Sequence, residues 1–266
     1  MQKVIRDKSR FLLSAVTHEM RNPLTLIQSY LQLVEGQYPQ IRNSSYWEIV
    51  KDELCHLNHI LNDFSLYQNG IHTSMEPTPM SDWLRAYIRT ISPVFNNFAE
   101  IDFLQEISDD LPILSIDSDK MRQLLDNLIR NSLEAIEQKR QGMREGAAAQ
   151  DMDTQNTMLQ DTVTKDMQPE KHQSEKEIRQ ADSVKVSAYM KGSFLHIDVT
   201  DTGCGVDLEK SSSVFEPFAS GKENGTGLGL PICRRIAQAH GGTVRLSCGC
   251  WGKTQFQVSL PAESRI

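Results

Sequence analysis

Two stretches near the N-terminus alternate apolar and polar residues with the period of an α-helix. In the first, over residues 11–31 and just beyond, apolar side chains recur every three or four positions: Leu12, Val16, Met20, Leu24, Ile27, Leu31 and Val34. The second has alternating steps of three and four, which is heptad spacing: Trp47, Val50, Leu54, Leu57, Leu61 and Phe64. Glycine, proline, asparagine and serine between residues 36 and 45 indicate a connection. The pattern predicts a helical hairpin over residues 1–70.

Such a hairpin cannot bury both of its apolar stripes by itself. Two hairpins can pair into a four-helix bundle, so the pattern favours a homodimer. His56 and His59 lie three positions apart in the second helix, and we interpret them as surface or packing residues rather than metal ligands.

After residue 70 the pattern becomes a mixture of helices and strands. Residues 71–80, with two prolines, are expected to form a linker. The pattern then predicts helices over residues 81–97 and 120–139, and a third that ends near residue 239. Strands are expected over residues 101–106, 113–115, 184–190, 194–200, 243–247 and 254–260. The predicted fold class is α+β, with the hairpin followed by a second domain over residues 81–262.

Residues 141–183 break this pattern. They contain no Phe, Tyr or Trp, and five basic against nine acidic residues give them a net charge of −4. Such a segment cannot bury enough apolar surface to offset the entropy lost on ordering. We interpret it as a disordered insertion in which some helix can form transiently.

Composition narrows the class of protein. With 266 residues and a net charge of −7, the chain has no basic bias toward nucleic acid. No run approaches the roughly 18 apolar residues of a membrane span, and the expected location is cytoplasmic. Five irregularly spaced cysteines are typical of reduced thiols. Cys248 and Cys250 have no second pair at metal-binding spacing, so no metal is expected there.

The first helix has a polar face opposite its apolar stripe. This face is expected to hold Ser14, His18, Arg21, Asn22 and Thr25. His18 would then sit on a rigid helix and point to solvent, with the carboxylate Glu19 directly after it. A lone histidine in this position is usually an ordinary surface residue, and only its neighbours change that interpretation.

Two segments of the second domain offer groups for a nucleotide. Asn127 and Asn131 are four apart, so their amides project from one helix face and offer the oxygens that Mg²⁺ accepts. Asp201, Gly203 and Gly205 directly follow a strand. A buried carboxylate there can accept a hydrogen bond from an exocyclic amine, while glycines let the backbone approach a flat base.

Two further segments indicate an aromatic anchor and a phosphate-binding loop. The rings of Phe215 and Phe218 can hold a loop by packing. Three glycines stand just before a helix, where free amides and the helix dipole favour phosphate: Gly225, Gly227 and Gly229. A dinucleotide-binding fold would need a strand before them, but residues 219–224 form a polar loop.

The order of these motifs resembles that of two-component sensor histidine kinases. H-E-x-R-N-P-L-T resembles the phosphoacceptor motif of their dimerisation domain. N-L-x-x-N, D-x-G-x-G, F-E-P-F and G-T-G-L-G-L resemble their Bergerat-type ATP-binding domain, an α/β sandwich. The resemblance is closest to the sporulation and nitrogen-regulator type. It implies a protein-histidine kinase that uses ATP and Mg²⁺ to phosphorylate His18, then passes the phosphoryl group to an aspartate of a response regulator.

The resemblance also implies roles for individual residues. Glu19 would polarise His18, which attacks as neutral imidazole, and Asn22 would orient water for the reverse, phosphatase, activity. Asn131 would hold Mg²⁺ with Asn127 nearby. The remaining expected nucleotide contacts are Asp201, Gly203, Gly205 and Thr254 at the adenine, Phe215 and Phe218 at the ATP lid, and Lys222, Gly225, Gly227, Leu228 and Gly229 at the triphosphate.

Some features depart from the family pattern, and two alternatives stay open. Ser132 stands where the family usually has alanine, and the insertion is longer than the usual connection. The family normally carries a sensor region before its histidine helix, so an input domain or membrane partner either lies outside this chain or acts as a separate protein. One alternative is another Bergerat-fold ATPase, which would not need H-E-x-x-N-P on a heptad helix. The other is a non-catalytic dimeric scaffold, although every catalytic position is intact.

Overall fold

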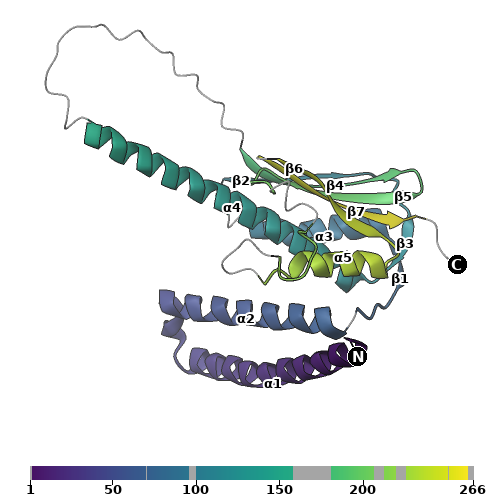
Figure 1. Cartoon of the computed structure of the whole chain (residues 1–266), viewed down its shortest axis with the longest axis horizontal. Helices are drawn as coiled ribbons and strands as arrows, with labels where there is room; N and C mark the ends of the chain where they lie inside the picture. The colour runs from purple at the N-terminus through teal and green to yellow at the C-terminus, as the bar shows by residue number, and fades with distance from the viewer. Residues whose placement is uncertain are drawn as a thin grey trace, which may run out of the picture.

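The computed structural model describes residues 2–69, 71–95, 100–157, 181–206, 213–219, 226–250 and 252–262. They form four layers, with a sheet, a layer of helices, then the helix α2 and, outermost, the helix α1 (Figure 1). The helices α1 (Gln2–Gln37) and α2 (Ser45–Asn69) are joined by a short 3₁₀ helix, η1 (Pro39–Asn43). These three elements are called the hairpin below.

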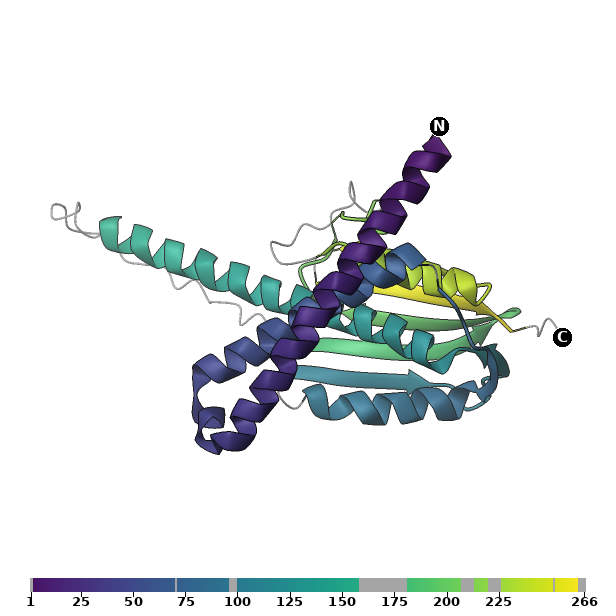
Figure 2. The same ribbon diagram turned by 90° about the horizontal axis from the view of Figure 1, so that it is seen from below.

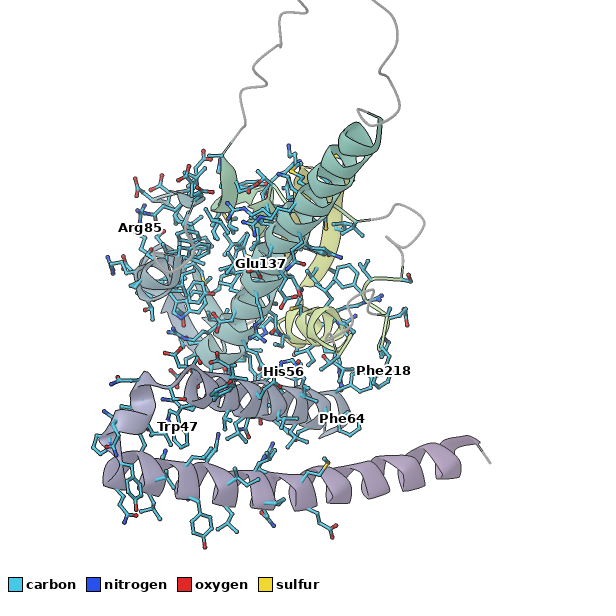
Figure 3. All side chains as sticks on the ribbon, turned by 90° about the vertical axis from the view of Figure 1, so that its left-hand side faces the viewer. Trp47, His56, Phe64, Arg85, Glu137 and Phe218 are labelled. Carbon is cyan, nitrogen blue, oxygen red and sulfur yellow. The ribbon has the colours of Figure 1, made fainter. Side chains whose placement is uncertain are left out.

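The hairpin forms where the heptad pattern predicts it, and α1 crosses the rest of the molecule diagonally (Figure 2). Its first helix begins at Gln2 and continues through Gly36 to Gln37, and so runs into the segment expected to be the connection. Glu35 near this end accepts a hydrogen bond from Arg42 at 3.0 Å and one from Lys51 at 3.3 Å. The start of α2 is held by Trp47, which is buried beside the connection (Figure 3).

The apolar stripes of the hairpin are covered on one side only. Every seventh residue of α2 is buried: Trp47, Leu54 and Leu61. The alternate heptad positions Val50 and Leu57 are each 42% exposed. In α1, Leu24 and Leu31 are half-buried, but Met20 and Ile27 of the same predicted stripe are 51% and 45% exposed. Each helix therefore covers about half of the other's seam.

The second domain is an α/β sandwich that follows α2, and its first strand already lies within residues 71–80, which were expected to be a linker. Its five-stranded sheet has the order β2-β4-β5-β7-β6, and only the β2–β4 pair is parallel. These strands are β2 (Ile101–Ile107), β4 (Asp182–Lys191), β5 (Phe194–Asp201), β6 (Thr243–Cys250) and β7 (Lys253–Pro261). The short strands β1 (Glu76–Pro79) and β3 (Ile113–Ile116) pair separately. The α+β class expected from the sequence is confirmed.

Three helices cover one face of the sheet: α3 (Met80–Phe95), α4 (Ser118–Thr157) and α5 (Gly229–Ala239). Each presents an apolar stripe to the strands, and a single core forms between the two layers. Its members include Leu84 of α3, Leu124 of α4, Ile232 of α5 and Ile197 of β5, all fully buried.

The helix α4 does not end near residue 139 as expected. It continues to Thr157 and projects beyond the sandwich (Figure 1). Residues 140–150 are rich in alanine, glutamine, arginine and glutamate, which have high helix propensity, so local preference extends the helix where no core supports it. The expected insertion at 141–183 is thus helical up to Thr157, and strand β4 already begins at Asp182. Residues 158–180 lie outside the described part of the chain.

Candidate functional site

One face of α4 forms the floor of the candidate site. Asn127, Asn131 and Ala135 are each four residues apart and therefore share this face, about 12 Å from first to last at 1.5 Å per residue. At one end, the start of α5 approaches, since a Cβ on Gly229 would lie 4.0 Å from Cγ of Asn127. At the other end, the loop after β5 packs on Ala135. Asn131 lies between these two boundaries.

The loop after β5 is held tightly against α4. Asp201, the last residue of β5, is buried, and its Oδ1 accepts a hydrogen bond from the amide of Gly203 at 2.9 Å. A Cβ on Gly203 would lie only 2.6 Å from Cβ of Ala135, so no side chain fits. The amide of Cys204 also donates to the carbonyl of Ala135 at 3.1 Å. This close packing on α4 requires glycine at position 203, and the expected approach of the D-x-G-x-G glycines to a base stays a prediction.

Strand pairing brings Thr254 to Asp201. The two residues are direct partners in the β5–β7 ladder, although 53 positions separate them in the chain. Oγ1 of Thr254 and Nδ2 of Asn127 are both buried and have no hydrogen-bond partner among the described residues. A buried polar atom without a partner costs roughly 1–3 kcal/mol. The hydroxyl of Thr254 lies in the strand next to Asp201 and can still form a hydrogen bond, whereas the Asn127 side chain also approaches the buried thiol of Cys233.

Two basic residues of α4 hold the loop that follows Asp201. Lys139 of α4 donates to the Thr202 carbonyl at 2.7 Å and to Asp182 at 2.9 Å. Arg140 donates to the second oxygen of Asp182 at 2.7 Å. Burial alone would raise the pKa of Asp182, but the hydrogen bonds and charges of Lys139 and Arg140 outweigh it and lower that pKa. These residues carry no motif, so the sequence did not reveal them.

The glycine-rich segment leads into α5 as expected. Gly227 adopts a positive φ of 64°, and its carbonyl accepts a hydrogen bond from the amide of Phe218 at 3.0 Å. Leu228 is buried in the core, and Gly229 begins α5. The amides of the first turn of α5 therefore face the end of the α4 floor marked by Asn127. The predicted contacts Lys222 and Gly225 lie outside the described residues.

The two phenylalanines of F-E-P-F do different things. Phe215 packs edge-on against Phe256 of β7, with ring centroids 6.2 Å apart, and so anchors its loop to the core. Phe218 is 64% exposed and packs edge-on against Tyr67 of α2 at 6.3 Å. Figure 3 shows Phe218 near the end of α2 that carries Phe64. Phe218 thus links its loop to the hairpin.

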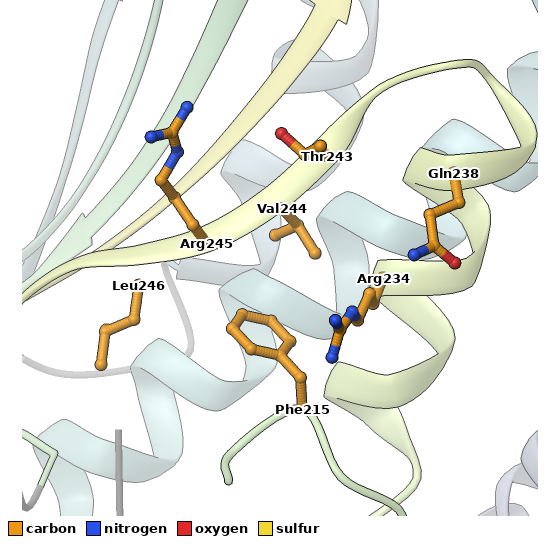
Figure 4. A pocket seen from close by; sticks show the side chains of 7 residues that line it. All are labelled: Phe215, Arg234, Gln238, Thr243, Val244, Arg245 and Leu246. Carbon is orange, nitrogen blue, oxygen red and sulfur yellow. The ribbon is translucent and has the colours of Figure 1, made fainter. Parts of the chain in front are cut away.

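Phe215 also lines a pocket of about 390 Å³ (Figure 4). The other lining residues belong to α5 and β6, and they are Arg234, Gln238, Thr243, Val244, Arg245 and Leu246. None of the asparagines, nor Asp201 or Thr254, lines it. This pocket is therefore separate from the α4 floor.

The hairpin contacts the sandwich through the C-terminal half of α2. Arg235 of α5 donates to the carbonyls of Leu66 and Tyr67, and its guanidinium lies 5.4 Å from the centre of the Tyr67 ring. The carbonyls at the end of a helix lack intrahelical partners, so a cation is favourable there. Nearby on α2, burial raises the pKa of Asp63 to about 6, partly offset by the charge of Arg130. Sequence patterns did not identify this contact.

The candidate phosphoacceptor residues lie on α1. Glu19 and Asn22 are exposed, as expected, and the side chain of His18 lies outside the described residues. Arg21 was expected on the same free face, but that expectation is wrong. Its guanidinium donates to Oδ1 of Asn62 on α2 at 3.0 Å, because a long polar side chain at the edge of the stripe can reach the sister helix. This hydrogen bond holds the helical turn that contains His18 beside Asn62, the residue before Asp63.

Two family models match this chain. The model described as histidine kinase-, DNA gyrase B-, and HSP90-like ATPase matches residues 116–264. The model described as His Kinase A (phospho-acceptor) domain matches residues 8–70. The phospho-acceptor match covers the hairpin and the ATPase match covers the sandwich from Ile116 onward, in the order that the motifs predicted.

Two curated relatives that match this chain are named as kinases. The chain is 26% identical over 251 residues to the signal transduction histidine-protein kinase AtoS of Escherichia coli (strain K12), covering 94% of this chain and 34% of AtoS. It is 26% identical over 256 residues to sporulation kinase C of Bacillus subtilis (strain 168), covering 95% of this chain and 49% of that protein. The chain thus spans a third to a half of these relatives.

A solved structure shares the fold. The crystal structure of full-length ShkA in complex with AMPPNP superposes with a TM-score of 0.66 at 23% identity, covering 94% of this chain and 45% of that one. No helix in the described part of this chain is long and apolar enough to cross a membrane.

Proposed function

The chain belongs to the family of histidine kinase-, DNA gyrase B- and HSP90-like ATPases, and from this membership we propose that it is an ATP-dependent protein-histidine kinase. It autophosphorylates His18 and passes the phosphoryl group to an aspartate of a response regulator. The observation that carries the proposal is the combination of an ATPase sandwich with a heptad hairpin that presents H-E-x-R-N-P on α1.

The chemistry of the α4 floor fits ATP. Asp201 and Thr254 lie side by side at the adenine end, where a carboxylate and a hydroxyl can bond the amine and ring nitrogens of the base. The α5 N-terminus lies at the other end, where amides and the helix dipole stabilise phosphate. The buried hydroxyl of Thr254, which has no hydrogen-bond partner among the described residues, supports a polar ligand beside Asp201.

Asn131 is the residue that would hold Mg²⁺ with the phosphates, and Asn127 lies nearby on the same helix. Asn131 lies on the α4 face between the adenine end and the phosphate end, and its carbonyl oxygen is a hard ligand. When bound, the ion would neutralise phosphate charge during transfer. Lys222, Gly225 and Phe218 complete this part of the proposal as lid and phosphate contacts.

The phosphotransfer step rests on neighbouring residues of α1. An imidazole nitrogen of His18 attacks the γ-phosphorus in line, the N–P bond forms, and ADP leaves. Glu19 accepts a hydrogen bond from the other ring nitrogen or takes its proton. Asn22, exposed on the next turn, orients water toward a regulator's phosphoaspartate in the phosphatase reaction.

The half-covered heptad stripes support a homodimer. Val50 and Leu57 of α2, with Met20 and Ile27 of α1, are exposed positions of a pattern whose other described members are buried or half-buried. Apolar seams of this kind are buried by the matching seam of a second hairpin in a four-helix bundle. The exposed seam supports a second copy of this chain as one partner. The second proposed partner, a response regulator, follows from the proposed phosphotransfer.

Incubation of the purified chain with γ-labelled ATP and Mg²⁺ tests the proposal. We expect an acid-labile, alkali-stable label that His18→Gln abolishes without changing nucleotide affinity. His56→Gln is the matched control, because His56 is an exposed histidine of the same hairpin, and it should label normally. Label that survives His18→Gln, or that appears on serine, would overturn the proposal.

A further inference from the structure

Two cysteines meet at the end of β6. Cys248 and Cys250 are two positions apart on a strand, so their side chains leave it on the same face, and their Sγ atoms are 3.4 Å apart. Both thiols also approach the carbonyl of Lys253, at 3.6 and 3.7 Å. Cys250 is exposed, and Cys248 is half-buried. A reagent from solvent can therefore reach this pair.

The pair borders the adenine end of the site. Gly249, between the two cysteines, is the ladder partner of Thr254, and Thr254 is in turn the partner of Asp201. The carbonyl of Gly249 accepts a hydrogen bond from the amide of Val206 at 2.9 Å, at the end of the D-x-G-x-G loop. The Cys250 carbonyl lies against Gly205, where a Cβ would be only 2.8 Å away. The cysteine segment therefore supports one wall of the proposed adenine pocket.

We propose that Cys248 and Cys250 are a redox-sensitive dithiol that peroxide converts to a disulfide, and that this disulfide weakens nucleotide binding. The first part stands on the thiol geometry alone, and the second rests on the proposed ATP site.

The oxidation balances with a peroxide as the oxidant. The Cys248 thiolate attacks one peroxide oxygen, an S–O bond forms, the O–O bond breaks, and the other oxygen leaves as hydroxide or alkoxide. The Cys250 thiol then loses its proton and its sulfur attacks the Cys248 sulfur, an S–S bond forms, the S–O bond breaks, and the former peroxide oxygen leaves as hydroxide, which takes up that proton to give water. Two electrons pass from the thiols to the peroxide. Hydrogen bonds from the amide and thiol of Cys250, followed by the Lys253 charge, lower the pKa of Cys248 and favour it as the first nucleophile.

A metal is a poorer explanation of the pair. Soft-metal sites of the zinc type hold about four ligands. No group of three or more histidine, cysteine, aspartate or glutamate residues that could hold an ion occurs among the described residues.

Closing the disulfide must disturb the strand. Residues two apart in an extended strand have Cα atoms about 6.7 Å apart, at the upper limit of the range that disulfides tolerate. The S–S bond is about 2.05 Å, so the sulfurs, now 3.4 Å apart, must move closer. Gly249 lies between them and has to follow, which shifts the partner of Thr254 and the acceptor of Val206. The adenine wall then loses its geometry.

Peptide mass measurement tests the disulfide directly. Trypsin cleavage after Arg245 and Lys253 releases residues 246–253, which contain both cysteines and no other. After treatment of the full chain with hydrogen peroxide, we expect this peptide to be two hydrogen atoms lighter and to regain them with dithiothreitol. Its absence, or a cross-link of either cysteine to Cys204, would overturn the proposal.

Binding of a fluorescent ATP analogue tests the coupling to the site. We expect peroxide to weaken its affinity at least about fivefold, the lower end of typical coupling between sites, and dithiothreitol to restore it. Cys250→Ser should bind equally well with or without peroxide, whereas Cys55→Ser, which removes an exposed thiol of α2, should respond like the parent chain. An unchanged affinity in the oxidised chain would refute the coupling. Failure of the reduced chain to bind would refute the ATP site instead, and the mass result would still decide the disulfide.

Discussion

The hairpin and the sandwich differ in how much of their apolar surface they bury. In the described residues, the hairpin buries the hydrophobic side chains of only Trp47, Leu54 and Leu61, and none of them belongs to the main core. The sandwich encloses one continuous core that runs from Met80 to Leu260. A core of that extent supports independent folding, whereas a hairpin with half its seam exposed depends on other surfaces. The sandwich thus has a core of its own, whereas the hairpin leaves apolar side chains exposed that another surface could cover.

Their contact is correspondingly local. Phe64, Leu66 and Tyr67 of α2 pack against the edge of the sandwich core, and Arg235 fastens the end of α2. The His18 turn lies on the far side of α2, held there by Arg21 and Asn62. The described contact therefore involves one end of α2 and the loop that carries Phe218, and the proposed phosphotransfer would require it to open.

The largest effect is expected at two neighbouring residues of the hairpin. Glu19→Ala should cut self-labelling by roughly 10²–10⁴-fold, because a general base is typically worth that much. Asn22→Ala should spare self-labelling within about a few fold and slow dephosphorylation of a regulator, since an amide cannot take the His18 proton. Self-labelling and phospho-regulator decay are measured for both variants. Equal loss of both activities in both variants would contradict this division of roles.

The next largest effect concerns the dimer. Ile27→Lys combined with Leu57→Lys places charges on the exposed apolar seam, and like charges across an interface cost several kcal/mol. We expect the dimer dissociation constant to rise at least about a hundredfold, with nucleotide affinity unchanged because the sandwich keeps its own core. Light scattering at graded concentrations measures the dissociation. Asp52→Lys on the exposed side of α2 is the control, and a dimer that survives the double change would show that another surface holds it.

Asp201→Asn tests the sandwich in isolation from the hairpin. A hydrogen bond to a charged group contributes about 1.5–3 kcal/mol, so we expect ATP affinity to fall by about tenfold to a hundredfold. The dimer dissociation constant should stay the same. Calorimetric titration with ATP and with GTP, which lacks the adenine amine, separates adenine recognition from general damage. A similar loss for both nucleotides would place Asp201 outside the adenine site.

The smallest effect is expected where the two units touch. The folded pKa of Asp63 is raised to about 6 by burial, so the folded state binds its proton more tightly than the unfolded state does. Its stabilising contribution is full below about pH 4, the unfolded pKa, and is lost as pH rises through 6. Asp63→Asn should therefore raise the melting temperature by about 2–4 °C at pH 7.5 and by less at pH 5.

Thermal melts across this pH range measure the effect. Asp52→Asn, on the exposed side of α2, is the matched control and should show no pH-dependent gain. A gain from Asp63→Asn that is the same at pH 5 and 7.5 would mean that the Asp63 charge does not oppose the contact.

Local sequence patterns predicted most helices and strands, and they supplied the candidate site residues, whose roles stay predictions. Helix period located both hairpin helices, and glycines located the loops at Gly203 and Gly227, because each signal depends on residues close together in the chain. The end of α4 was missed because an insertion judged by its lack of core residues still has strong helix propensity. The Arg21–Asn62 bond was missed because a side chain's length lets it leave the face that its position assigns.

Sequence patterns were sufficient to predict the hairpin, the α+β class and the order of the two family matches. Which of the candidate site residues lie side by side depends on the tertiary structure. The row Asp201–Thr254–Gly249 joins three strands, and no local period records which strands will pair. The structure also shows which heptad positions are buried and which are exposed. The sequence pattern cannot show this, because an apolar stripe looks the same whether one helix or two helices pack against it. Pairing and coverage depend on surfaces far apart in the chain, and packing free energy rather than local preference selects them.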